Sequence, residues 1–397
     1  MRTRRLFLKE SGISLAGFAT APPFLLRTAL AQKTVVTGKD RPVLIAVFQR
    51  GAADGVSMAV PFGDKHYHAA RPQIAIDQPI DLDGFFGLHP ALASLKPIYD
   101  EGHLGVVHAV GSPNHTRSHF DAQDYMESGA PGNKGVADGW LNRTLIRKPD
   151  YDASAFRAVS FTSTTPRSLM GPAPVVSMTR ISDFSILGGT ATAEAAIVFQ
   201  KMYPETFAAV SMLRQANPQQ YSPARGIQYP GTPFGQAMLQ IAQLIKADVG
   251  LEVAFAELGG WDTHANQGAT EGQLAARLRE FGDSLAALYR DLGDRMRNVV
   301  LLTMTEFGRS IRQNGSGGTD HGHASCSLVL GGPVKGGKVY GDWPGLAKDQ
   351  LFEQRDLAIT TDFRDLFAEI LARHMNVSDV ATVFPGFRPA QVPPNLM

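Results

Sequence analysis

The chain has 397 residues, 44% of them hydrophobic, and its 38 Lys and Arg residues are nearly balanced by 37 Asp and Glu residues. Nothing in this balance suggests a nucleic-acid-binding protein, which would show a clustered basic excess. The single cysteine, Cys326, excludes an intramolecular disulfide framework and a four-cysteine iron–sulfur cluster, so the candidates for holding a metal are His, Asp and Glu.

The N-terminus has the order of an export signal. Residues 3–9, TRRLFLK, form a twin-arginine motif, an apolar region follows over residues 13–26, and Ala29-Leu30-Ala31 has the pattern of a cleavage site. The apolar region is too short to span a bilayer stably and contains Pro22 and Pro23, so we expect no permanent membrane anchor.

The sequence therefore predicts a twin-arginine signal peptide over residues 1–31 and one mature domain over residues 32–397. We expect the twin-arginine translocase to be a partner during export and the mature protein to be periplasmic or extracellular. Cleavage would remove five of the 38 basic residues and one of the 37 acidic residues, which leaves a net charge of −3.

Short apolar runs predict buried strands, and apolar residues at helical spacing predict helices between them. The strands are expected over residues 42–48, 104–110, 251–258, 299–305 and 327–330, and the helices over residues 232–248, 271–292 and 361–375. This alternation indicates an α/β fold. Residues 140–230, with many Pro, Gly, Ser and Thr residues, predict a loop-rich insertion or cap, to which the sequence assigns no role.

Polar clusters follow four of these strands. Asp54 comes after the first strand, as a metal ligand or as the cap of the next helix. After the second strand, Ser118 has the position of a helix N-cap, with Asp121 three residues on. Ser118 is either that cap or a nucleophile at the positive end of the helix dipole, beside the candidate catalytic residues Arg117 and His119. Arg117 could hold an anionic substrate through paired hydrogen bonds.

The remaining two clusters contain mainly acids and imidazoles. Asp262 and His264 lie two apart in the loop after the third strand, where they either bind one ion or lie in solvent. Glu306 ends the fourth strand, and a Gly- and Ser-rich loop leads to Asp320, His321 and His323. Polar groups gather at the carboxyl ends of strands in open α/β sheets, so these residues predict a composite metal site.

The candidate ligands of that site are seven residues: Asp54, Asp262, His264, Glu306, Asp320, His321 and His323. Oxygen ligands mixed with imidazole suit a divalent ion, and we expect one or two ions of zinc, manganese or calcium. Two adjacent ions would activate a water or a serine and stabilise charge on a phosphoryl or sulfuryl oxygen.

The motifs FQRGAADG, NHTRSHFDAQDYME, GGWDTH, TEFGR and GGTDHGHAS, together with the leader, resemble a large bacterial family known as domain of unknown function 1501. That family is similar to the alkaline phosphatase and sulfatase superfamily. The resemblance covers most of the mature chain. It implies a doubly wound, mostly parallel sheet with helices on both faces, and one or two metals at strand ends.

The resemblance also implies roles for particular residues. Asp54 corresponds to the first-strand ligand, Ser118 to the nucleophile, and Asp262 with His264 and His321 to the ligands of one metal. Glu306 occupies the place of the Asp in an Asp-His pair, and Phe307 replaces its His. The implied function is hydrolysis of small or polymer-linked phosphate or sulfate esters. The alternative is a non-catalytic periplasmic or envelope-associated binding protein that retains the fold.

Overall fold

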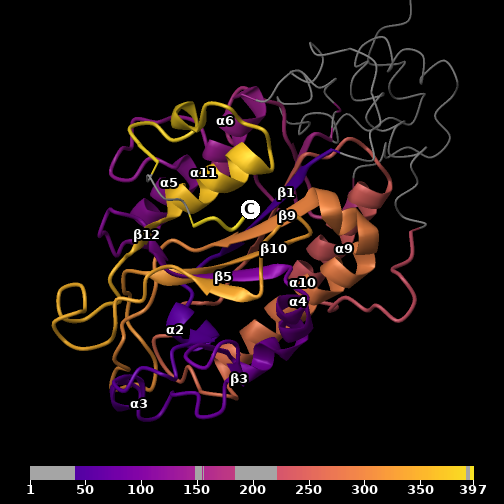
Figure 1. Ribbon diagram of the computed structural model, residues 1–397. Helices are drawn as coiled ribbons and strands as arrows, with labels where there is room; N and C mark the ends of the chain where they lie inside the picture. Colours follow the sequence, from indigo (N-terminus) through magenta and orange to yellow (C-terminus); the bar gives the residue numbers. More distant parts are fainter. Residues whose placement is uncertain (1–40, 148–153, 155, 184–220, 390–393) are drawn as a thin grey trace, which may run out of the picture.

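A computed structural model describes residues 41–147, 154, 156–183, 221–389 and 394–397. Within these residues, a nine-stranded sheet has the order β11-β5-β10-β9-β1-β8-β6-β7, with β12 also paired to β5 (Figure 1). Its strands are β1 (Val43–Gln49), β5 (Leu104–Gly111), β6 (Ala158–Ser160), β7 (Val176–Ser177), β8 (Val253–Leu258), β9 (Val299–Met304), β10 (Ser325–Gly331), β11 (Lys338–Tyr340) and β12 (Thr361–Asp362). The five predicted strands are β1, β5, β8, β9 and β10.

Most of the strand pairs are parallel, as predicted. β1 lies between β8 and β9 and is parallel to both, and β6 is parallel to β8 and to β7. The exception is β10, which runs antiparallel to both β9 and β5. The chain enters β10 from a loop without a crossover helix, and such a connection reverses the strand direction. This reversal brings the residues that precede β10 to the edge where β9 ends.

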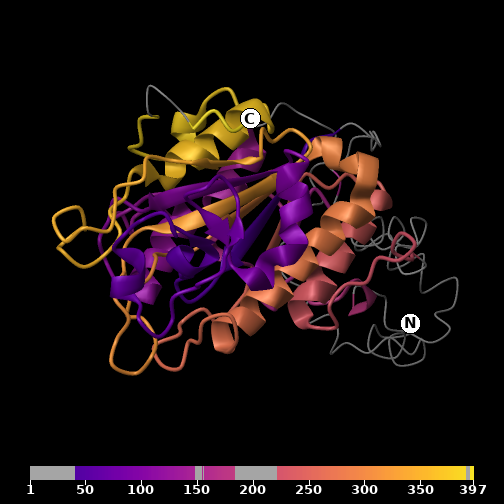
Figure 2. The ribbon, with the colours of Figure 1, turned by 60° about the horizontal axis from the view of Figure 1, so that its bottom comes forward.

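Helices cover both faces of the sheet, in agreement with the predicted α/β class. Alternate side chains of β1 point to opposite faces. Ile45 and Val47 belong to a core with α9 (Pro233–Lys246) and α10 (Gln273–Leu292), whereas Leu44 and Phe48 belong to a core with α6 (Trp140–Arg147) and α11 (Phe363–Arg373). Figures 1 and 2 show α11 on one side of the sheet and α9 and α10 on the other.

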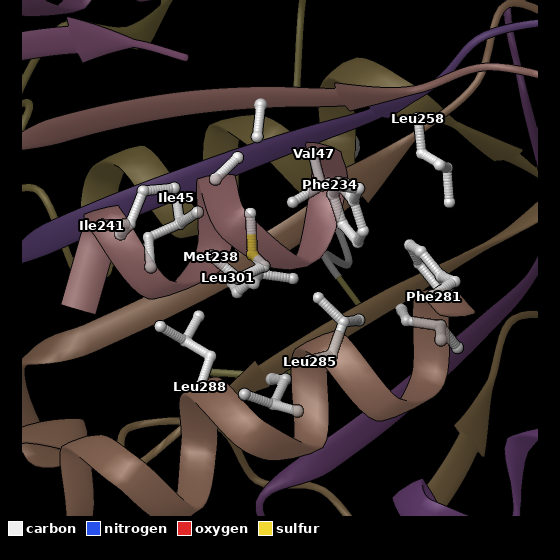
Figure 3. Close-up of a cluster of buried hydrophobic side chains, with 14 of the residues drawn as sticks. Ile45, Val47, Phe234, Met238, Ile241, Leu258, Phe281, Leu285, Leu288 and Leu301 are labelled. Atoms are coloured by element: carbon white, nitrogen blue, oxygen red, sulfur yellow. The ribbon is translucent and has the colours of Figure 1, made fainter. Parts of the chain in front are cut away.

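The helix α10 forms because its apolar residues recur every three or four positions and face the sheet. Figure 3 shows Phe281, Leu285 and Leu288 of α10 directed toward Ile45 and Leu301 of the strands. Burying a leucine side chain fully contributes about 1.5–3 kcal/mol, so this stripe fixes the helix that leads into β9. The predicted stripe is fully buried at six positions: Leu274, Leu278, Phe281, Leu285, Leu288 and Leu292.

Smaller elements surround this core. β2 (Ala59–Val60), β3 (Ile80–Asp81) and β4 (Gly87–Leu88) form a three-stranded sheet, and the short helices are α2 (Gly55–Met58), α3 (Tyr67–Ala70) and α4 (Lys96–Asp100). α5 (His119–Ser128) follows β5. No helix among the described residues combines the length and apolar character needed to cross a membrane.

The predicted signal peptide over residues 1–31 lies outside the described residues. Of the predicted insertion over 140–230, residues 184–220 also lie outside them. The described part contributes to the main sheet, because β6 pairs with β8 and β7 extends the edge. Trp140, at the start of α6, is completely buried against Phe367 of α11. The role of this range as a cap stays a prediction.

Candidate metal centre

Three loops at one edge of the sheet bring His119, Asp262, His264 and His321 together. His119 is the first residue of α5, after β5, and Asp262 and His264 lie in the loop after β8. His321 precedes β10, whose reversed direction places it at the same edge. The sequence had assigned these four side chains to three separate strand ends.

The ligand atoms of the four side chains are close to one another. Nε2 of His321 lies 3.0 Å from Nε2 of His119 and 3.0 Å from Nε2 of His264. Oδ1 of Asp262 is 2.9 Å from Nε2 of His264 and 3.2 Å from Nε2 of His321. Oδ2 of Asp262 is 3.5 Å from Nε2 of His119. Three imidazole nitrogens therefore surround one carboxylate, and His119, Asp262 and His321 offer ligand atoms within 4.8 Å of one another.

The other nitrogen of each imidazole faces an oxygen. Nδ1 of His321 donates to the Arg117 carbonyl at 2.9 Å, because a carbonyl oxygen only accepts. Nδ1 of His119 lies 2.8 Å from Oε1 of Glu306, and Nδ1 of His264 lies 3.4 Å from Oδ1 of Asp320. A neutral imidazole that donates from Nδ1 has its lone pair on Nε2. This pattern orients the histidines of metal sites in proteins.

The electrostatics favour the metal-binding forms of Asp262 and His321, whereas they favour protonation of His119. The hydrogen bond with Glu306 raises the pKa of His119 above its usual value. Burial lowers the pKa of His321, which favours the neutral ring. Burial alone would raise the pKa of Asp262, but its hydrogen bond and ion pair with Arg309 outweigh that effect and lower it. Ionised carboxylates and neutral imidazoles are the forms that bind metal.

Arg309, which the sequence prediction did not include, fixes Asp262. Its buried guanidinium donates from Nη1 to Oδ1 of Asp262 at 2.5 Å and from Nε to the Thr319 hydroxyl at 3.1 Å. The Thr319 hydroxyl in turn donates to Oε1 of Gln267 at 2.9 Å. The only sequence signal was the place of Arg309 in the TEFGR motif, because a cation among expected ligands does not indicate a metal site.

Phe307 forms an apolar support for the cluster. Its ring centroid is 5.0 Å from that of His119 and 5.0 Å from that of His321, and 4% of the residue is exposed. It packs in a small buried group with Ala52 and Ala122. The residue that replaces the expected histidine therefore lies against two imidazoles of the cluster.

Glu306 and Asp320 lie behind the imidazoles and do not join the central carboxylate. Glu306 is 1% exposed, and its Oε1 also accepts from the Gly51 amide at 2.9 Å and from Nε2 of Gln123 at 2.9 Å. Asp320 is exposed, and its Oδ1 accepts from Nδ2 of Asn314 at 3.0 Å. Both carboxylates are placed to hold a histidine in orientation.

Asp54 is separate from the cluster. Its oxygens accept from Nη1 and Nη2 of Arg71 at 2.6 and 2.9 Å, and Oδ2 also accepts from Ser57 and Gln267, each at 2.8 Å. Its side chain makes no capping hydrogen bond with α2. Burial opposes ionisation of Asp54, but Arg71 outweighs it and lowers the pKa of the carboxyl. The structure thus shows no capping contact for Asp54, and its carboxylate is held by an arginine.

His323 also points elsewhere: its ring stacks on Phe352 with centroids 4.3 Å apart, and burial lowers its pKa to about 4. Ser118 occupies the predicted N-cap position of α5, but its exposed side chain makes no capping hydrogen bond. The Arg117 guanidinium contacts Asp356 and Glu353 and does not point into the cluster.

The donor set fits a zinc-like ion. Tetrahedral zinc with bonds of about 2.0–2.1 Å places neighbouring ligand atoms about 3.3 Å apart. The contacts of His321 Nε2, at 3.0, 3.0 and 3.2 Å, are close to that separation, and ligand atoms of His119, Asp262 and His321 all lie within 4.8 Å of one another. Three nitrogens and one carboxylate fit calcium poorly, because calcium takes six to eight oxygen ligands.

The chain belongs to the family described as "Protein of unknown function (DUF1501)", whose model matches residues 102–385. The predicted family membership is therefore confirmed. No curated protein matches the chain.

Several solved structures are similar to this chain at low sequence identity. The C-terminal periplasmic domain of EcEptC from Escherichia coli, in complex with Zn, is 9% identical with a TM-score of 0.36, and the match covers 75% of each chain. The PsFucS1 sulfatase from Pseudoalteromonas sp. is 10% identical with a TM-score of 0.33, covering 80% of this chain and 68% of that one. The alkaline phosphatase from the Antarctic bacterium TAB5 is 10% identical with a TM-score of 0.31, covering 74% and 93%. At these TM-scores the likeness says nothing about activity.

Proposed function

We propose that this chain is an exported, metal-dependent hydrolase of phosphate or sulfate esters. The observation that supports the proposal most directly is the imidazole arrangement around Asp262. Three Nδ1 atoms face oxygens and three Nε2 atoms lie on the side of the carboxylate. Orienting contacts of this kind accompany metal-bound histidines.

His119, Asp262, His264 and His321 hold one divalent ion in this proposal, with zinc the first candidate and manganese the second. A bound ion supplies positive charge to the oxygens of the reacting group and lowers the pKa of the attacking hydroxyl. The number of ions is one, because the residues considered for a second ion have other partners. Asp54 is paired with Arg71, and Glu306 accepts hydrogen bonds from three groups, among them His119.

Ser118 is the proposed nucleophile. It directly precedes His119, its side chain is exposed, and it is not used in capping α5. The free amides and positive end of a ten-residue helix favour an anion at this position. In the proposed reaction the Ser118 oxygen bonds to phosphorus or sulfur, the ester alcohol leaves, and water later releases the phosphate or sulfate.

The alternative, a non-catalytic binding protein of the periplasm or envelope, has one specific observation in its favour. The Arg117 guanidinium is bound to Asp356 and Glu353, so it is not presented to a substrate in this arrangement. Under both proposals the twin-arginine translocase exports the protein, and we expect neither a nucleic-acid partner nor a permanent membrane anchor. The enzyme proposal adds an anionic ester, small or polymer-linked, as substrate.

Hydrolysis of chromogenic aryl phosphate and aryl sulfate by the zinc-loaded mature protein tests the proposal. Ser118→Ala should lower turnover by at least about a thousandfold, since loss of a nucleophile removes the covalent route. Ser316→Ala, also an exposed serine in a loop, is the matched control and should keep full turnover. Full turnover in Ser118→Ala would contradict the serine route. Absence of hydrolysis by zinc-loaded wild type across both ester classes would favour the binding protein.

A further inference from the structure

A tight turn over residues 352–356, here called the clamp turn, lies beside the metal cluster. The backbones of Phe352 and Asp356 exchange two hydrogen bonds of 2.9 and 3.0 Å. Glu353 and Gln354, inside the turn, have φ angles of +50° and +57°. Residues other than glycine rarely adopt this left-handed conformation, because the Cβ atom approaches the next carbonyl oxygen. Such residues are maintained where the surrounding structure holds them in place.

One side of the clamp turn binds Arg117. Oδ2 of Asp356 accepts from Nε of Arg117 at 3.1 Å and from Nη2 at 2.6 Å, and Oε2 of Glu353 accepts from Nη2 at 2.6 Å. Asp356 is completely buried, whereas Glu353 is exposed. The buried carboxylate is therefore the main anchor of the arginine, since an exposed ion pair contributes little.

The other side of the clamp turn binds the loop that carries His321. Arg355 donates from Nη2 to the His321 carbonyl oxygen, and it also pairs through Nε with Oδ1 of Asp356 at 3.1 Å. The ring of Phe352 stacks on His323 at 4.3 Å with an interplanar angle of 25°. The turn thus contacts both the loop before α5 and the loop before β10.

These two loops meet at the cluster itself. The carbonyl oxygen of Arg117 accepts the Nδ1 proton of His321 at 2.9 Å, and this contact directs Nε2 toward Asp262. A displacement of Arg117 would move the acceptor that orients His321. It would also move the start of α5, which carries His119 two residues later.

We infer that the clamp turn positions the metal ligands, with Asp356 and Arg117 as positioning residues, and that Arg117 does not contact substrate. This inference rests on the proposed function, because it assigns the turn to the proposed metal site.

Zinc affinity of the mature protein, measured by competition with a chromogenic chelator, tests the inference. Asp356→Asn should weaken zinc binding by about 10–100-fold, the usual effect of removing a partner that orients metal ligands. Arg117→Lys keeps the charge but loses the two-pronged contact with Asp356, and should also weaken binding by about tenfold. The matched control is Gln354→Gly, which relieves the left-handed backbone in the same turn without touching Arg117, and should leave the affinity unchanged.

The same variants separate the inference from the proposed function. Unchanged zinc affinity in both Asp356→Asn and Arg117→Lys, with wild type binding zinc, overturns the inference and leaves the metal site intact. If wild-type protein binds no zinc, the proposed function fails, and amide hydrogen exchange of the metal-free proteins decides the positioning role. Faster exchange in residues 115–123 and 319–324 of Asp356→Asn, but not of Gln354→Gly, then supports that role. Equal exchange in the two variants overturns it.

Discussion

The two carboxylates that face cluster histidines, Glu306 and Asp320, allow a test of the metal centre by comparing their effects on metal affinity. Glu306 and Asp320 each face the Nδ1 atom of a cluster histidine, but they differ in burial and distance. Glu306 is 1% exposed and lies 2.8 Å from His119, whereas Asp320 is exposed and lies 3.4 Å from His264. The two carboxylates should therefore contribute very unequally to metal binding.

Glu306→Gln keeps the size of the side chain and removes its charge. In wild type, one oxygen of Glu306 accepts from His119, Gly51 and Gln123; the amide oxygen of glutamine can take its place, but it is a neutral and weaker acceptor for the His119 ring. We expect zinc affinity to fall by about 10–100-fold, the range found for the loss of partners that orient metal-binding histidines. At 1.36 kcal/mol per tenfold change, the loss is about 1.4–2.7 kcal/mol of binding free energy.

Asp320→Asn is the matched control for this measurement. Its long, exposed contact with His264 should contribute less than about 1 kcal/mol, or less than about fivefold in affinity. Zinc affinity of both variants is measured by chelator competition at pH 7, after circular dichroism has established that each is folded. Equal losses in the two variants, or no loss in Glu306→Gln, would refute the assignment of Glu306 as the partner of a metal-bound histidine.

The buried pair of Asp54 and Arg71 gives two predictions about stability. Arg71→Met should lower the free energy of unfolding by about 3–5 kcal/mol, because it leaves an unpaired buried carboxylate. This free energy is measured by urea denaturation at pH 7. A loss below about 1 kcal/mol would contradict a structural role for the pair. The folded pKa of Asp54 is lowered by Arg71, so its contribution to stability is present above the unfolded pKa of about 3.9 and is lost as the pH falls through the folded value. In Arg71→Met burial is no longer offset and raises the pKa of Asp54. The difference in free energy of unfolding between wild type and variant should therefore become smaller as the pH falls from about 7 to about 4. A difference that stays constant would show that the ionised Asp54 carboxylate does not cause the loss of stability.

The apolar pattern of the sequence predicts the framework well. Continuous runs such as residues 42–48 and 299–305 become strands buried on both faces, β1 and β9, because only a strand covered on both sides needs apolar residues at every position. The direction of β10 was not predicted. An apolar run reads the same in both chain directions, so its pattern does not show whether the strand lies parallel or antiparallel to its neighbours.

The sequence predicted at which edge of the sheet the candidate site lies, but not which side chains contact one another there. Strand ends placed Asp262, His264 and His321 at one edge, because parallel strands end together. A difference of a few ångströms decides whether a carboxylate binds the metal itself or accepts a hydrogen bond from a metal-binding histidine. Glu306 and Asp320 have side chains that could do either. Spacing in the chain therefore could not distinguish them.

Asp54 shows a second limit of sequence reasoning. Its partner Arg71 lies 17 residues later, beyond short irregular elements, and nothing in that segment indicates an inward-pointing arginine. A carboxylate after a strand is a ligand if its surroundings are polar and open, and half of an ion pair if a cation is buried beside it. Only the packed structure distinguishes these two environments.

Metal content of the mature protein is the measurement that tests the central claim most directly. Elemental analysis would be made on wild type, His321→Ala and the control His68→Ala, an exposed histidine of α3 outside the cluster. We predict close to one divalent ion per chain in wild type and in the control, and a large loss in His321→Ala. Folded wild-type protein without metal after exposure to zinc and manganese, or full metal content in His321→Ala, would contradict the metal centre described for this chain.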